Sequence, residues 1–119
     1  MNFEEELRSV TTGVEGALGA VLMGFDGIPV AEVKTEGVSS SLQDISVEFS
    51  RLLTEAAHIA QANDLGTAQE LSVSFDKHRL LFRVVTPDYF VFLWLKPSAN
   101  LGKGRYLLRR VQPLLQAEL

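Results

Sequence analysis

Two histidines, a set of carboxylates and one glycine-lysine sequence are the residues of this chain that could support catalysis. The histidines are His58 and His78. Neither has a partner at a metal-ligand spacing such as i+4 on a helix. The chain contains no cysteine, which excludes disulfides, thiolate chemistry and most zinc sites. Carboxylates gather in residues 4–6 and are otherwise scattered, as on an ordinary solvated surface. We therefore expect no catalytic residue, no metal and no cofactor.

The sequence Leu101-Gly102-Lys103-Gly104 partly fits a phosphate-binding loop. That motif needs a further glycine five residues before Gly102, where Pro97 stands. It also needs Ser or Thr directly after the lysine, where Gly104 stands. We interpret the segment as the flexible start of a helix.

Length and composition indicate one folded, acidic domain. The chain has 119 residues, of which 46% are hydrophobic, and its formal net charge is −4; such a chain can bury one core. An acidic chain lacks the clustered basic surface that nucleic-acid binding needs. No apolar run approaches the ~20 residues that span a bilayer, and the acidic residues 1–7 do not fit a targeting signal. We expect a single domain over residues 1–119, cytoplasmic, bound to neither nucleic acid nor membrane.

The first half of the chain predicts a helix, a hairpin and a second, long helix. Residues 2–15 have helical apolar spacing, with glutamates in the first turn that complement the helix dipole. Residues 20–25 and 28–33 read as strands joined by Asp26-Gly27, a strong signal for a two-residue type I′ turn. The long helix follows three serines and extends to about Asp64.

The long helix has two stripes and several possible N-caps. Ser39, Ser40 and Ser41 can each cap it, and Ser40 with Gln43 forms a possible capping box. The stripe expected to cover the sheet consists of Leu42, Ile45, Phe49, Leu52, Leu53, Ala56, Ile59 and Ala60. A second stripe of small residues, Ser46, Ser50 and Ala57, is expected elsewhere on the helix surface. It predicts a symmetric helix–helix contact, with ordinary solvent exposure as the open alternative.

The second half of the chain predicts three strands and a final helix. Residues 71–75 alternate strictly between apolar and polar, whereas residues 80–86 and 89–95 are apolar almost throughout and belong in the middle of a sheet. A C-terminal helix begins near Leu101. The predicted order is α-β-β-α-β-β-β-α. The fold class is α+β, a five-stranded, mainly antiparallel sheet with helices on both faces.

Two segments are predicted to bind other proteins. The strand over residues 71–75 is a candidate edge that pairs with a second copy; its apolar positions are Leu71, Val73 and Phe75. Alternatively, the charges of Glu70, Asp76 and Lys77 protect that edge. The hairpin tip is predicted to dock on a different partner through Phe25, Asp26, Gly27 and Ile28. In a two-residue turn Phe25 and Ile28 would share one face with Met23 and Val30, or both would tuck under a terminal helix.

Three segments resemble the Roadblock family over nearly the whole chain. They are residues 16–22 (GALGAVL), residues 26–31 (DGIPVA) and residues 100–103 (NLGK). The chain is similar to the small bacterial Roadblock proteins of the Mgl polarity system. The resemblance implies a homodimer built through the long helix and the third strand. It also implies regulation of a Ras-like, MglA-like small GTPase, directly or through an MglB-like Roadblock protein.

Three functions follow as hypotheses. The chain ends directly after the final helix, which favours an MglC-like adaptor in cell polarity and motility that binds an MglB-like protein. The first alternative is a direct GTPase activator, for which Arg51, Arg79 and Arg83 are available, although nothing distinguishes them from solvated arginines. The second alternative is a ligand-sensing α/β domain, which requires an apolar pocket with convergent polar groups.

Overall fold

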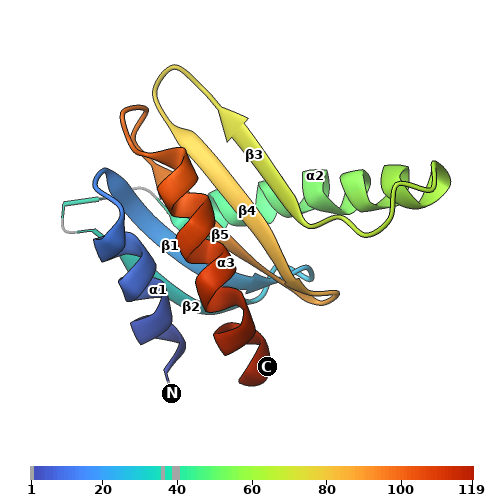
Figure 1. Cartoon of the computed structure of the whole chain (residues 1–119), viewed down its shortest axis with the longest axis horizontal. Helices are drawn as coiled ribbons and strands as arrows, with labels where there is room; N and C mark the ends of the chain where they lie inside the picture. The colour runs from blue at the N-terminus through green and yellow to red at the C-terminus, as the bar shows by residue number, and fades with distance from the viewer. Residues whose placement is uncertain (1, 36, 39–40) are drawn as a thin grey trace.

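The computed structural model describes residues 2–35, 37–38 and 41–119. The predicted order of elements and the α+β class are confirmed. Along the chain the elements are α1 (Phe3–Gly13), β1 (Ala17–Gly24), β2 (Pro29–Lys34), α2 (Leu42–Ala62), β3 (Glu70–Ser74), β4 (Arg79–Thr86), β5 (Tyr89–Leu95) and α3 (Leu101–Ala117) (Figure 1). Ser39 and Ser40, and with them the predicted capping box, lie outside the described residues. Ser41 caps α2, because its Oγ accepts a hydrogen bond from the N–H of Asp44 at 3.2 Å.

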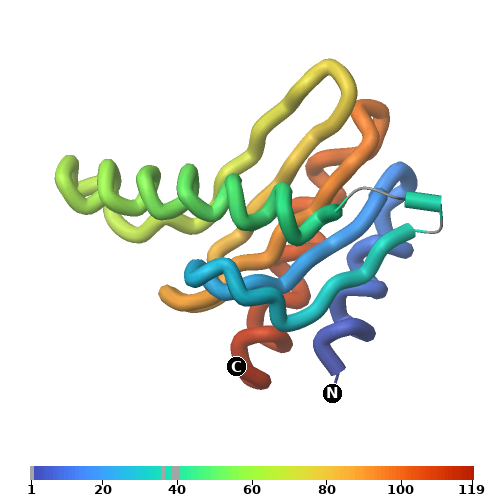
Figure 2. The backbone as a smooth tube through the Cα atoms, turned by 180° about the vertical axis from the view of Figure 1, so that it is seen from behind, coloured from blue at the N-terminus to red at the C-terminus, as the bar shows by residue number. Residues whose placement is uncertain are grey.

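The sheet has the strand order β2-β1-β5-β4-β3, and its neighbours pair antiparallel. The two apolar strands β4 and β5 lie inside the sheet, as predicted, and β3 lies at an edge. Helices α1 and α3 lie side by side on one face (Figure 1). Helix α2 crosses the other face, and its C-terminal half projects past the sheet (Figure 2).

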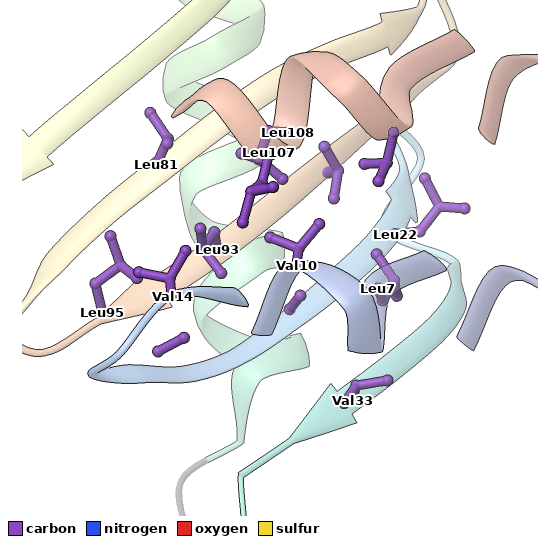
Figure 3. Close-up of a cluster of buried hydrophobic side chains, with 14 of the residues drawn as sticks. Leu7, Val10, Val14, Leu22, Val33, Leu81, Leu93, Leu95, Leu107 and Leu108 are labelled. Carbon is purple, nitrogen blue, oxygen red and sulfur yellow. The ribbon is translucent and has the colours of Figure 1, made fainter. Parts of the chain in front are cut away.

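Each face of the sheet carries its own hydrophobic core. On the α1/α3 face, leucines and valines of both helices interdigitate with those of the strands, among them Leu7, Val10, Leu93 and Leu108 (Figure 3). On the α2 face the core is aromatic, with Phe82, Phe90, Phe92 and Trp94 buried. Phe82 and Phe92 stack with ring centroids 4.7 Å apart. These aromatic rings form much of the sheet surface on which α2 packs.

The β1–β2 hairpin differs from the prediction. The N–H of Gly24 donates to the carbonyl of Ile28 at 2.9 Å, so the loop has three residues, Phe25-Asp26-Gly27. Gly27 has a φ of 87°, but Asp26 does not have the positive φ that a type I′ turn also demands. The carboxylate of Asp26 accepts the N–H of Ile28 at 3.0 Å, which favours the wider loop. The prediction of a two-residue type I′ turn is therefore wrong.

Candidate protein-interaction surfaces

The small residues of α2 face the sheet of their own chain. Ser46 is 0% exposed and Ser50 is 6% exposed. The Oγ of Ser46 donates to the carbonyl of Leu42 at 2.7 Å, and that of Ser50 donates to the carbonyl of Val47 at 2.6 Å. Hydroxyls bonded to their own helix can be buried at little cost. The prediction of a free surface is therefore wrong for Ser46 and Ser50, and neither serine is available to a partner here. Ala57, the third member, is half-buried.

The predicted apolar stripe of α2 covers the sheet only in part: Leu42, Leu53 and Ala60 are buried, as predicted. Ile45 and Phe49 are half-buried, while Leu52 and Ile59 are each 51% exposed. The reason is helical geometry: Leu52 precedes the buried Leu53 by one residue and Ile59 precedes the buried Ala60 by one residue. One residue is about 100° of helix rotation, which carries both exposed side chains away from the sheet. Leu52 and Ile59 are left without a covering element among the described residues.

Strand β3 and the residue after it contribute a second group of partly exposed apolar side chains. Leu71 and Val73 are half-buried and Phe75 is 52% exposed. Leu71 pairs in register with Phe82 and packs on the aromatic core, so alternation places this set on the α2 face. Phe49 also stacks on Phe82, at 5.3 Å between ring centroids, and so joins the two sets. We name the combined surface the α2/β3 face; it consists of Ile45, Phe49, Leu52, Ile59, Leu71, Val73 and Phe75.

Glu70 does not protect the edge of β3. Its side chain lies on the opposite face, where Oε2 accepts a hydrogen bond from Nε of Arg105 at 2.6 Å. Its other oxygen, Oε1, lies 3.8 Å from Nη1 of Arg83. Asp76 and Lys77 are exposed in the turn beyond β3. On the side of β3 away from β4, no strand of the described residues pairs with its backbone N–H and C=O groups. The nearby charges of Asp76 and Lys77 lie only beyond the end of the strand.

The hairpin tip separates into an inner and an outer part. Phe25 is half-buried on the α2 face, packs on Phe90 at 5.1 Å between ring centroids, and donates its N–H to the carbonyl of Asp88 at 2.9 Å. Ile28, by contrast, is 64% exposed. The shared face predicted for Phe25 and Ile28 is wrong because the three-residue loop shifts their register, and neither residue tucks under a terminal helix. The neighbouring Met23 is fully buried, whereas Val30 is exposed.

A groove of about 450 Å³ lies beside the tip, between the C-terminal half of α2, residues 66–69 and the end of β4. Its apolar lining includes Phe25, Leu53 and Ala57. Its one charged lining residue, Arg83, donates from Nε to Oε1 of Gln112 at 2.6 Å and is already engaged. The groove has a volume typical of ligand sites, and its lining also carries the polar side chains of Gln61, Thr67, Gln69 and Thr86.

The residues with catalytic chemistry are not brought together. His58 is exposed on α2, and His78 packs on Trp94 with ring centroids 4.8 Å apart. Within residues 2–35, 37–38 and 41–119, no three side chains of metal-ligating type converge. Over the same residues, no helix has the length and apolar character to cross a bilayer.

Comparison with known proteins assigns the family. No protein-family model matches the chain, and no curated protein matches it. Among solved structures, MglC from Myxococcus xanthus is 42% identical over 100% of both chains, with a TM-score of 0.72. MglB from Thermus thermophilus is 16% identical over 95% of this chain and 84% of that one, with a TM-score of 0.84. A Roadblock/LC7 domain from Streptomyces avermitilis is 16% identical over 97% and 98% of the two chains, with a TM-score of 0.79. The last two show the shared fold, and the full-length identity to MglC shows that the chain belongs to the MglC group of the Roadblock/LC7 family.

Proposed function

We propose that this protein is a cytoplasmic, non-catalytic, homodimeric adaptor. It binds a related, MglB-like Roadblock protein and thereby regulates an MglA-like small GTPase in bacterial cell polarity and motility. The observation that carries the proposal is the α2/β3 face, an apolar surface bounded by an unpaired strand edge. Such a surface is typical of a protein that pairs with another chain.

A second copy of the chain fits the α2/β3 face. Two β3 strands that pair edge to edge form one continuous sheet across a two-fold axis. The same axis brings Leu52 and Ile59 of one copy against the α2 helix of the other. This arrangement covers the apolar side chains and the strand edge in one step. We therefore assign the α2 part of the interface to the exposed Leu52 and Ile59 instead of the buried Ser46 and Ser50.

The hairpin tip is the proposed contact for the MglB-like protein. Asp26 and Ile28 are exposed and form the contact itself. Phe25 positions the loop through Phe90 and Asp88. Gly27 lies close to α2, since a Cβ built on it would be 3.8 Å from Val47. The tip is thus anchored at its inner side and free at its outer side, as suits a docking element.

Calorimetric titration with the purified MglB-like protein of the same organism tests this contact. Ile28→Asp is expected to weaken binding at least about tenfold, while the variant still sediments as a dimer. Leu65→Asp is the matched control, because Leu65 is 70% exposed but lies in the loop after α2. Unchanged affinity for Ile28→Asp would remove the tip from the proposal.

Direct activation of the GTPase is the competing function, and the same proteins distinguish it. The adaptor proposal expects no faster GTP hydrolysis when this chain is added to the GTPase alone. It expects an altered rate only when the MglB-like protein is also present. Acceleration by this chain alone would favour the direct activator.

A further inference from the structure

Helix α3 carries the densest positive charge in the molecule. It contains Lys103, Arg105, Arg109 and Arg110 and no acidic residue between positions 101 and 117. The chain has eleven basic residues in all, so seven are left elsewhere against fifteen acidic ones. A basic helix on an otherwise acidic body is a local feature that the net charge of −4 conceals.

Stability of the helix does not account for these charges. Lys103 stands in the first turn, where the helix dipole favours acidic residues, and the first turn of α3 has none. Arg105 is used internally by Glu70. Lys103, Arg109 and Arg110 are exposed, and none of them forms an ion pair within the described part of the chain.

An aromatic side chain stands among these cations. Tyr106 is 62% exposed. It lies three residues from Lys103 and from Arg109 and four from Arg110, so all three flank it on the helix surface. The opposite side of α3, including Leu107 and Leu108, packs into the core (Figure 3). Tyrosine and arginine, together with tryptophan, are the residue types most enriched among those that dominate the energy of protein interfaces.

We propose that this surface, the α3 face (Lys103, Tyr106, Arg109 and Arg110), is a docking site for an acidic protein. Carboxylates of the partner pair with the three cations, and Tyr106 inserts between them as the apolar anchor. Within one copy of the chain, three exposed cations fall short of the roughly four to eight that recruit a protein to an anionic membrane surface; the dimer proposed above presents six, so the vesicle experiment below separates the two occupants. The three cations also fall short of the basic stripe that nucleic-acid binding needs.

The α3 face is pre-organised and independent of the surfaces proposed above. The hydrogen bond from Arg105 to Glu70 ties α3 to β3 across one face of the sheet, which limits the cost of ordering the helix on binding. The α3 face lies on the side of the sheet opposite to α2 (Figures 1 and 2). One molecule can therefore hold the acidic partner while the α2/β3 face and the tip are occupied.

Site-specific photo-crosslinking in the native cell identifies the partner. A photoreactive phenylalanine derivative replaces Tyr106, and a matched control replaces Thr12, which is exposed on the neighbouring helix α1. We expect a protein adduct at position 106 that is absent at position 12, with the contact in an acidic segment. The adduct partner is then purified and titrated against the full-length chain.

The titration distinguishes a specific contact with carboxylates from a general effect of protein charge and from membrane binding. Arg109→Glu/Arg110→Glu is expected to weaken binding at least about tenfold. The charge-matched control Lys34→Glu/Lys77→Glu and the conservative Arg109→Lys/Arg110→Lys are expected to retain most of it. Binding should also weaken between about 0.1 M and 1 M NaCl. No adduct specific to position 106, or an affinity insensitive to the arginine reversal, overturns the proposal. So does arginine-dependent binding to vesicles of pure phosphatidylglycerol, which would make the face a membrane site instead.

Discussion

Phe49 of α2 stacks on Phe82 of β4, with ring centroids 5.3 Å apart and 29° between the ring planes. Together with the buried Leu42 and Leu53, this contact fixes the rotation of α2 about its own axis. With Phe49 packed at the flank of the helix, Ser46 and Ser50 lie directly over the sheet and Leu52 and Ile59 point away from it. This rotation leaves Leu52 and Ile59 exposed on the surface of α2.

The buried position of Ser46 makes a size-dependent prediction. Ser46→Ala keeps the volume small and should change the free energy of unfolding by less than about 1 kcal/mol. Ser46→Leu forces a large side chain against a filled sheet and should lower it by about 1–3 kcal/mol. Urea denaturation measures both. Equal stability of the two variants would mean that Ser46 does not lie against the sheet.

The two apolar residues of the hairpin tip should differ in their effect on stability. Phe25→Ala removes a ring packed on Phe90 and should lower the free energy of unfolding by about 2 kcal/mol, below the 3–5 typical of a full core position because Phe25 is half-buried. Ile28→Ala should change it by less than about 0.5 kcal/mol, since Ile28 is exposed. The comparison is made by chemical denaturation. The reverse ranking would contradict the division of the tip into inner and outer parts.

Glu70 is predicted to hold the edge strand to α3. Glu70→Ala leaves Arg83 and Arg105 facing each other without a carboxylate and should cost about 1–3 kcal/mol of stability. Arg105→Ala should cost less, because one cation remains for Glu70 and the Arg105 side chain is the more exposed partner. Thermal unfolding of the two variants tests the ranking. A loss within about 0.5 kcal/mol for Glu70→Ala would show an ordinary surface pair.

Local patterns were sufficient to predict the order of elements but not the rotation of α2. The apolar runs over residues 80–86 and 89–95 require strands buried on both sides, and β4 and β5 are such strands. On α2, hydrophobicity alone ranks Leu52 and Ile59 as inward and Ser46 as outward. The opposite holds because Leu52 and Ile59 each lie one residue before a buried position, Leu53 and Ala60, and because the serine hydroxyls are satisfied within the helix.

The remaining differences come from information that a single sequence carries weakly. Asp26-Gly27 is compatible with both a two-residue and a three-residue loop, and the bond between Gly24 and Ile28 decides for the longer one. Glu70 and Arg105 are 35 positions apart in the sequence, so no local residue spacing predicts their hydrogen bond. Residues 101–117 contain four basic and no acidic residues, but the net charge of −4 for the whole chain does not indicate this local excess.

The measurement that tests the central proposal most directly is the mass of the protein in solution with and without the apolar stripe of α2. Sedimentation equilibrium of the wild type should give twice the chain mass of 13.1 kDa. Leu52→Asp/Ile59→Asp should give the monomer mass while circular dichroism shows a folded chain. The control Thr54→Asp/His58→Asp, which changes exposed residues on the other flank of α2, should stay dimeric. A monomeric wild type, or a Leu52→Asp/Ile59→Asp variant that remains a dimer, would contradict self-association through the α2/β3 face.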